Sequence, residues 1–129
     1  MNDISSIFVN ACRVGDISYV KKLIEVDIDV KNKGLLQASR YGHVDIIELL
    51  LKNGADIEAT NEYGSTPLVL AACWHNISVV KLLLDPQIEG VLGAKSDCMT
   101  YYLDDMSEII KELIENSRSR NIKPANRFI

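Results

Sequence analysis

A pattern of small and aliphatic residues recurs through this sequence at a spacing of about 33 residues. The two clearest copies occupy residues 35–51 and 68–84, and an earlier copy at 8–24 is joined to them by a shorter connection. A degenerate fourth copy carries Ile109, Ile110, Leu113 and Ile114. A period of this length is typical of solenoids, in which each repeat buries its apolar face only against its neighbours. The chain is therefore expected to be a stack of short repeats.

Each copy divides into two predicted helices. The first is short and rich in Ala, Ser and Cys, which allow close backbone approach, and the second carries aliphatic residues at helical spacing. Gly15 and Gly42 follow the first helix of their copies, where glycine adopts a left-handed conformation at little cost and turns the chain back. Residues 86–96 match no copy and are expected to form an irregular loop. The pattern predicts an all-α protein of about eight helices.

The central copies resemble the ankyrin repeat. The segment NEYGSTPL at 61–68 is followed by VVKLLL at 79–84, and the preceding copy contains YGHVDIIELLL at 41–51, closed by NGADI at 53–57. The resemblance covers about residues 4–115. It implies an ankyrin-repeat solenoid of helix-turn-helix repeats with short hairpin loops. Its approximate repeats are 4–30, 31–60 and 61–90, with a degenerate C-terminal cap at 95–116.

Several positions depart from the family pattern. His75-Asn76 stands where Gly-His is expected, and Val69 replaces the usual histidine after Thr-Pro-Leu. In the family, that histidine and a threonine hydroxyl tie neighbouring loops together, so the third repeat is expected to be looser, with Val69 compensating by packing. Residues 31–34 lack the Thr-Pro pair, which leaves the turn into the second repeat open.

Length and charge indicate one domain with a distinct tail. A chain of 129 residues that is 47% hydrophobic and 25% charged predicts a single globular domain, placed at 1–116. The tail at 117–129 is basic, contains no acid and is expected to be flexible. Its charges are Arg118, Arg120, Lys123 and Arg127. Because the whole chain has a net charge of −4, the rest is acidic, which disfavours nucleic acid as a partner.

The chain is expected inside the cell, in the cytoplasm. The longest apolar stretch, 68–74, has only seven residues, so no transmembrane helix or membrane partner is predicted. The N-terminus has no basic start and no apolar signal core, and three cysteines cannot all pair within one chain. The nucleus is an alternative location, as is a host cell if the chain is viral or microbial.

The resemblance implies a partner surface made of hairpin tips and the concave side of each first helix. The positions that align with this surface are Arg13, Val14, Arg40, Tyr41, Glu62, Tyr63, Ser65, Cys73 and Trp74. Tyr41 and Trp74 share a column, so ankyrin stacking would place them about 10 Å apart on one face. Large amphipathic rings are enriched as binding anchors. The alternative is that Trp74 only covers the neighbouring helix pair.

The sequence shows no pattern expected of a catalytic or metal site. Cys73 and His75 are close, but structural zinc needs four converging ligands, and Cys12, Cys98 and His43 belong to other repeats. Cys12 and Cys98 are expected to be small buried hydrophobic residues, and His43 to cap a loop. Asp104 and Asp105 are expected to place negative charge at the start of the last helix. No glycine loop of the phosphate-binding type is present, and neither cofactor nor metal is predicted.

These features favour a protein-protein interaction module over other functions. We expect a monomer that binds another protein through the concave helix face and the hairpin tips, as an adaptor or an inhibitor. The alternative is a self-associating scaffold element, in which terminal repeats stack between chains. An enzyme is the least favoured class, because the sequence offers no combination of acid, base and nucleophile.

Overall fold

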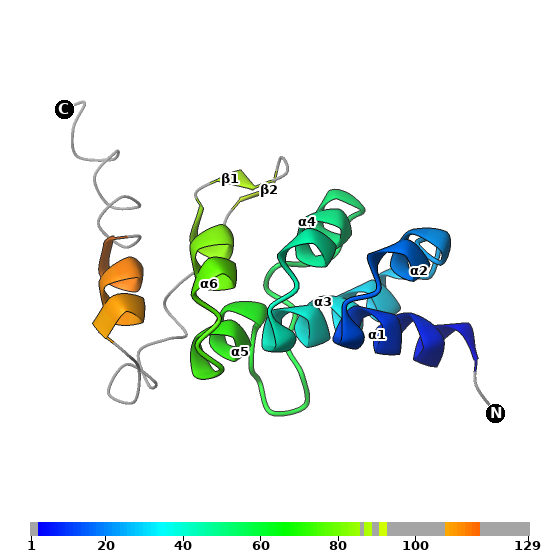
Figure 1. Ribbon diagram of the computed structural model, residues 1–129, viewed down its shortest axis with the longest axis horizontal. Helices are drawn as coiled ribbons and strands as arrows, with labels where there is room; N and C mark the ends of the chain where they lie inside the picture. Colours follow the sequence, from blue (N-terminus) through cyan, green and yellow to red (C-terminus); the bar gives the residue numbers. More distant parts are fainter. Residues whose placement is uncertain (1–2, 86, 89–90, 93–107, 117–129) are drawn as a thin grey trace.

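The chain forms a row of antiparallel helix pairs (Figure 1). The structure is a computed structural model that describes residues 3–85, 87–88, 91–92 and 108–116. The labelled helices are α1 (Ile4–Val14), α2 (Ile17–Lys22), α3 (Ile28–Tyr41), α4 (Val44–Lys52), α5 (Pro67–Cys73) and α6 (Ile77–Leu84). A further helix spans 108–116.

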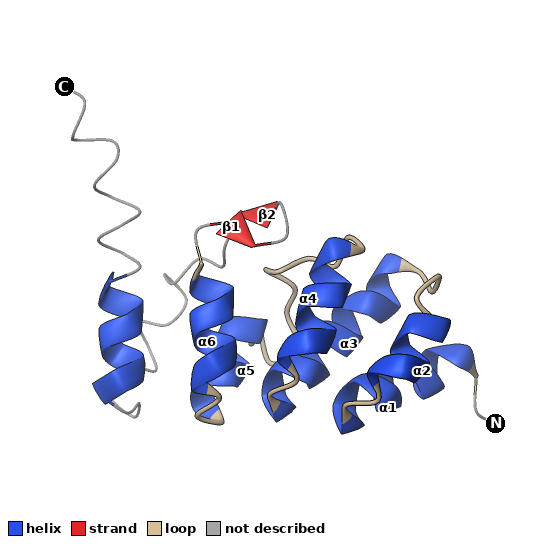
Figure 2. Cartoon of the chain, turned by 45° about the horizontal axis from the view of Figure 1, so that its top comes forward, coloured by secondary structure: helices blue, strands red, loops and turns tan. Residues whose placement is uncertain are grey.

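The helices form two layers. The first helix of each pair packs on the first helix of the next, α1 on α3 and α3 on α5, and the second helices stack in the same order (Figures 1 and 2). Each repeat thus buries its apolar side against its neighbours. This arrangement confirms the predicted all-α stack of helix-turn-helix repeats.

Short polar side chains cap the N-terminal ends of α1, α2, α3 and α5. The side chain of Asp3 accepts a hydrogen bond from the Ser6 amide at 2.8 Å, and Asp27 accepts one from the Val30 amide at 3.1 Å. Thr66 caps α5 in the same way, followed by Pro67 in the first turn, where no backbone donor is needed. Such caps satisfy amide groups that have no partner within the helix.

Left-handed turns close the first helices of all three pairs, as predicted for the two that carry glycine. Gly15 and Gly42 end α1 and α3 with φ values of 88° and 83°. His75 occupies the same place after α5, with φ of 57°, although it is not glycine. The repeat therefore keeps the turn where its usual residue is missing, at a modest backbone cost.

The connection into the second repeat is helical. The sequence did not determine the conformation of residues 31–34. These residues lie inside α3, so no hairpin tip forms there. Gly34 sits where α3 crosses α1. A Cβ atom at this position would lie 2.7 Å from the Cys12 Sγ and 3.0 Å from the Phe8 ring. Glycine is thus required by the close approach of the two helices.

The aliphatic residues of the repeated pattern form one continuous core. Leu35, Ile46, Leu50, Leu68 and Leu83 are fully buried within it. It extends into the helix at 108–116, which contributes Ile110 and Ile114. The repeats therefore share a single interior, as a solenoid requires.

Two predictions for individual buried residues are confirmed. Cys12 is fully buried, and this burial raises the pKa of its thiol to about 12, because the thiolate would lose its hydration. Cys12 therefore behaves as a small hydrophobic residue. Val69 is also buried, as expected of a residue that compensates by packing for the missing histidine. Cys98, Asp104, Asp105 and the tail at 117–129 lie outside the described residues.

The segment after α6 differs from the expected irregular loop. The short strands β1 (Gln87–Ile88) and β2 (Val91–Leu92) pair antiparallel, as Figure 2 shows in red. The prediction of an irregular loop is therefore wrong for these four residues, because neighbouring backbone groups pair there. The rest of 86–96 lies outside the described residues.

The described part of the chain contains no helix with the length and apolar character needed to cross a bilayer.

Leu50→Ala should destabilise the protein by about 2–5 kcal/mol, because the fully buried side chain leaves a cavity between repeats. Urea unfolding followed by circular dichroism measures this loss. The control is Lys52→Ala on the same helix, where an exposed side chain is removed and a change within about 0.5 kcal/mol is expected. Equal stability of the Leu50 variant and the parent would contradict the helical register.

Candidate functional site

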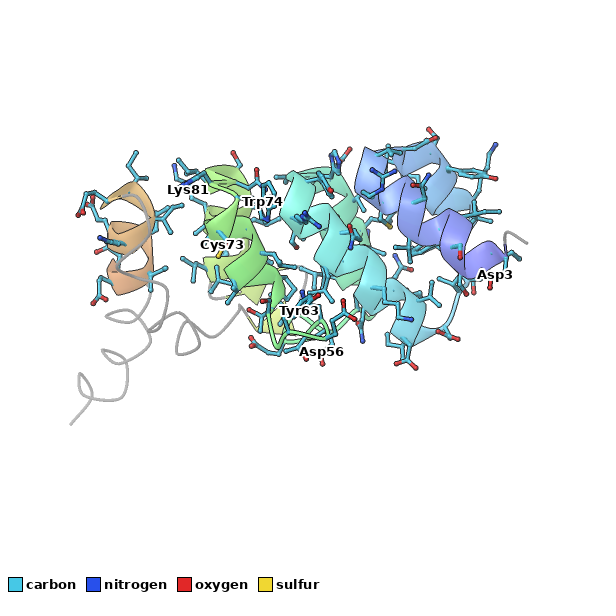
Figure 3. All side chains as sticks on the ribbon, turned by 90° about the horizontal axis from the view of Figure 1, so that it is seen from below. Asp3, Asp56, Tyr63, Cys73, Trp74 and Lys81 are labelled. Atoms are coloured by element: carbon cyan, nitrogen blue, oxygen red, sulfur yellow. The ribbon has the colours of Figure 1, made fainter. Side chains whose placement is uncertain are left out.

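A groove of about 620 Å³ lies between α3, α5 and the loop that joins α4 to α5. It is formed by Lys33, Leu36, Gln37, Arg40, Thr60, Asn61, Glu62, Tyr63, Ser65, Leu70 and Trp74. Figure 3 shows this side of the molecule, with Trp74 at the end of α5 and Tyr63 on the loop. The groove is therefore bounded by side chains from two repeats and by the hairpin between them.

Helical spacing explains which side chains face the groove. On α3, the positions 33, 36, 37 and 40 are separated by three or four residues and so share one helix face. On α5, Leu70 and the capping residue Trp74 are likewise one turn apart. Leu36, Leu70 and the Trp74 ring make part of the surface apolar, whereas Lys33 and Arg40 add positive charge.

The loop side of the groove is held by Asn61. Its Oδ1 accepts hydrogen bonds from the amides of Tyr63 at 2.9 Å and Ser65 at 3.0 Å. The backbone amide of Asn61 donates to the backbone carbonyl of Ser65 at 3.1 Å, which closes the turn. Gly64 takes the left-handed conformation that the turn requires. The result is a defined hairpin tip that exposes 80% of Tyr63.

Arg40 joins the two aromatic residues of the shared column. Its Cζ lies 4.7 Å from the centroid of the Trp74 ring and 5.2 Å from that of Tyr41, distances typical of cation-π contacts. The Nε atom of Arg40 is buried and makes no hydrogen bond within the described part of the chain. Tyr41 and Trp74 remain 43% and 54% exposed. The three side chains thus form a stacked cluster that still faces solvent.

Asn76 fixes the backbone beneath this cluster. Its Nδ2 donates to the carbonyl of Arg40 at 2.7 Å and to that of Ser39 at 3.1 Å. These carbonyls belong to the last turn of α3, where no amide of the helix donates a hydrogen bond to them. Asn76 therefore ties the third repeat to the end of α3, directly behind the groove.

His43 makes the corresponding bond one repeat earlier. Its Nε2 lies 2.9 Å from the carbonyl of Arg13 and donates to it when that nitrogen is protonated. The expected structural role of His43 is thus confirmed, and its contact lies at the end of α1 in the preceding repeat, because the side chain makes no cap hydrogen bond in α4. Histidine and asparagine serve the same purpose at this position, since each offers an N–H donor to the preceding helix.

The groove brings together most of the residues that the resemblance singled out. Arg40, Glu62, Tyr63, Ser65 and Trp74 line it. Tyr41 lies beside it through its contact with Arg40, and Cys73 is exposed on α5 outside the lining. Arg13 and Val14 are exposed on α1, one repeat away.

Some lining residues were not predicted. They are Lys33, Leu36, Gln37, Thr60, Asn61 and Leu70. Helical spacing back from Arg40 could have indicated Leu36 and Gln37, which lie in the predicted helix, and also Lys33, had residues 31–34 been assigned to it. Among the described residues, no three His, Cys, Asp or Glu side chains gather as metal ligands would.

Comparisons with known proteins agree with the repeat architecture of the chain. A family model described as ankyrin repeats (3 copies) matches residues 8–92. An ankyrin repeat, SAM and basic leucine zipper domain-containing protein 1 from Colobus guereza is 38% identical over 102 residues, covering 75% of this chain and 21% of that protein.

Two further relatives come from a virus and a plant. Putative ankyrin repeat protein R886 of Acanthamoeba polyphaga mimivirus is 42% identical over 53 residues, covering 39% of this chain and 41% of that protein. Serine/threonine-protein kinase 12 of Arabidopsis thaliana is 36% identical over 75 residues, or 54% of this chain and 16% of the kinase. The chain thus spans less than half the length of each relative.

Asn76→Ala should destabilise the protein by about 1–3 kcal/mol, because the carbonyls of Ser39 and Arg40 lose their donor at a half-buried position. Thermal and urea unfolding measure the effect. Asn76→His places the residue of the second repeat here and should lose less stability than the alanine variant. Equal loss in both variants would show that the side-chain donor does not tie the repeats together.

Proposed function

This chain belongs to the ankyrin-repeat family, and we propose that it binds a partner protein through the groove between α3, α5 and the hairpin tip. Ankyrin repeats are generally protein-interaction modules, so the function is sought in a surface. In this proposal the groove is the main contact, and Tyr63 on the hairpin tip extends it.

The observation that carries the proposal is the exposed aromatic cluster at the groove. Tyr41, Tyr63 and Trp74 present large ring surfaces, and the Arg40 guanidinium contacts the rings of Tyr41 and Trp74. Tyr, Trp and Arg are the residues most enriched among binding hot spots. The hairpin restrains the backbone of Tyr63, and Asn76 restrains that of Arg40, so less backbone entropy is lost when a partner packs there.

One groove supports an inhibitor more directly than an adaptor. An inhibitor needs a single face that covers a partner's surface, whereas an adaptor must hold a second protein elsewhere. A second hollow of about 510 Å³ at α1 and α2 offers a place for such a contact. It is lined by Ser6, Ile7, Asn10, Ala11, Val14, Asp16 and Tyr19.

Self-association is the second candidate, and the same end of the solenoid favours it. Ile4, Val14 and Tyr19 expose apolar surface on α1 and α2. A second copy of the chain stacked there would bury this surface as a neighbouring repeat does. A molecular mass in solution that stays monomeric as concentration rises would exclude this candidate.

Affinity capture from cell extract tests the proposal. The parent chain should capture a partner that the Tyr41→Ala, Trp74→Ala double variant loses, because truncating hot-spot aromatics costs about 2 kcal/mol or more each. Helical content must match between the two proteins.

Tyr19→Ala is the matched control, since it removes an exposed ring outside the groove. Loss of the partner in this control alone would place binding at α1 and α2 instead. Retention of the partner by the double variant would contradict the groove as the main contact.

A further inference from the structure

We propose that the groove recognises a carboxylate, from an aspartate or glutamate on an extended segment of the partner, through the guanidinium of Arg40. The inference rests on the proposed function and specifies the chemistry of the partner. An apolar side chain next to the acid on the same segment completes the recognised feature.

Arg40 carries a charge that the described chain does not balance. No carboxylate of the described residues lies within 4.0 Å of its guanidinium, and its Nε makes no hydrogen bond there. A cation partly withdrawn from water gains most from an anion that supplies both charge and hydrogen bonds. A carboxylate does so, because its two oxygens match the fork of a guanidinium.

The aromatic rings preorganise the Arg40 guanidinium for such a ligand. The Cζ atom of Arg40 lies 4.7 Å from the Trp74 ring centroid and 5.2 Å from that of Tyr41, so the two rings contact the guanidinium and restrict its movement. A stacked arginine loses less side-chain entropy on binding than one that moves freely. The Asn76 bond to the Arg40 carbonyl restrains the backbone of the same residue.

The charge of the groove favours an anion over a cation. Lys33 lies two helical turns before Arg40, and both side chains line the groove, whereas Glu62 is the one acidic residue among its described lining residues. The chain as a whole has a net charge of −4. The acidic surface as a whole therefore repels an acidic segment, whereas Lys33 and Arg40 attract it to the groove. This difference favours binding at the groove over other parts of the surface.

The apolar part of the groove defines the neighbour of the acid. Leu36, Leu70 and the Trp74 ring lie beside Arg40 in the lining. An aliphatic or aromatic side chain of the partner would cover them, while Glu62 disfavours a group with two negative charges. These features favour an Asp or Glu adjacent to an apolar residue over a phosphorylated segment.

Selection from a library of random-sequence peptides tests the inference with the full chain as bait. Peptides that the Tyr41→Ala, Trp74→Ala double variant fails to bind should be enriched in Asp or Glu next to an apolar residue. In a synthetic peptide of this kind, Asp→Asn or Glu→Gln should weaken binding by about tenfold or more, since a charge-assisted hydrogen bond is lost. This substitution is in the peptide, so it leaves the folding of the protein untouched.

Protein variants assign the effect to Arg40. Arg40→Gln should weaken the acidic peptide about as much as the peptide substitution does, and the two changes together should cost little more than one. Arg40→Lys keeps the charge without the planar group and should fall between. The control is Lys52→Gln, which removes an exposed positive charge on α4 outside the groove and should bind like the parent.

The outcomes separate this inference from the proposed function. Groove-dependent peptides without an acidic preference, with a basic preference, or with equal affinity for the Arg40→Gln variant would overturn the inference and leave the binding module standing. The absence of groove-dependent peptides together with the absence of a captured partner would overturn both.

Discussion

The bond between each repeat and the end of the preceding helix is the interaction on which the rest of the structure depends. A helix leaves carbonyls without partners in its last turn, and in α1 and α3 the next repeat supplies the donor, from His43 and from Asn76. Apolar packing between helices is strong but not directional. These side-chain bonds add direction, because the donor must lie opposite the carbonyls of one particular turn. They therefore fix the register in which the aliphatic core residues of neighbouring repeats meet.

The same constraint places the candidate site. Asn76 bonds to the backbone carbonyl of Arg40. Trp74, the C-cap residue of α5 in the next repeat, contacts the Arg40 guanidinium. The groove thus exists only when two repeats are stacked in register, with the hairpin tip closing one side through Asn61. A loss of stacking would remove the binding surface together with the core that the two repeats share, so recognition and stability are coupled.

The fold was largely predictable from the sequence, and the site was predictable in part. The repeat period, the left-handed glycines and the buried aliphatic positions follow from local patterns that the structure bears out. The helical conformation of residues 31–34 could not be derived from the local sequence. Gly34 is required there because α3 packs closely against the Cys12 and Phe8 side chains of α1. The contacts of Arg40 with the Tyr41 and Trp74 rings depend on how closely neighbouring repeats pack. Sequence alignment therefore identified these three residues but could not predict the contacts between them.

Fluorescence of the single tryptophan tests the central claim most directly, that the groove beside Arg40 receives the partner. Trp74 is the only tryptophan in the chain, so its emission reports on this site without labelling. Titration with a partner or peptide should change the emission spectrum saturably, with a midpoint equal to the dissociation constant from calorimetry. Binding that calorimetry detects while the emission of Trp74 stays constant would contradict the account, because the partner would then contact another face.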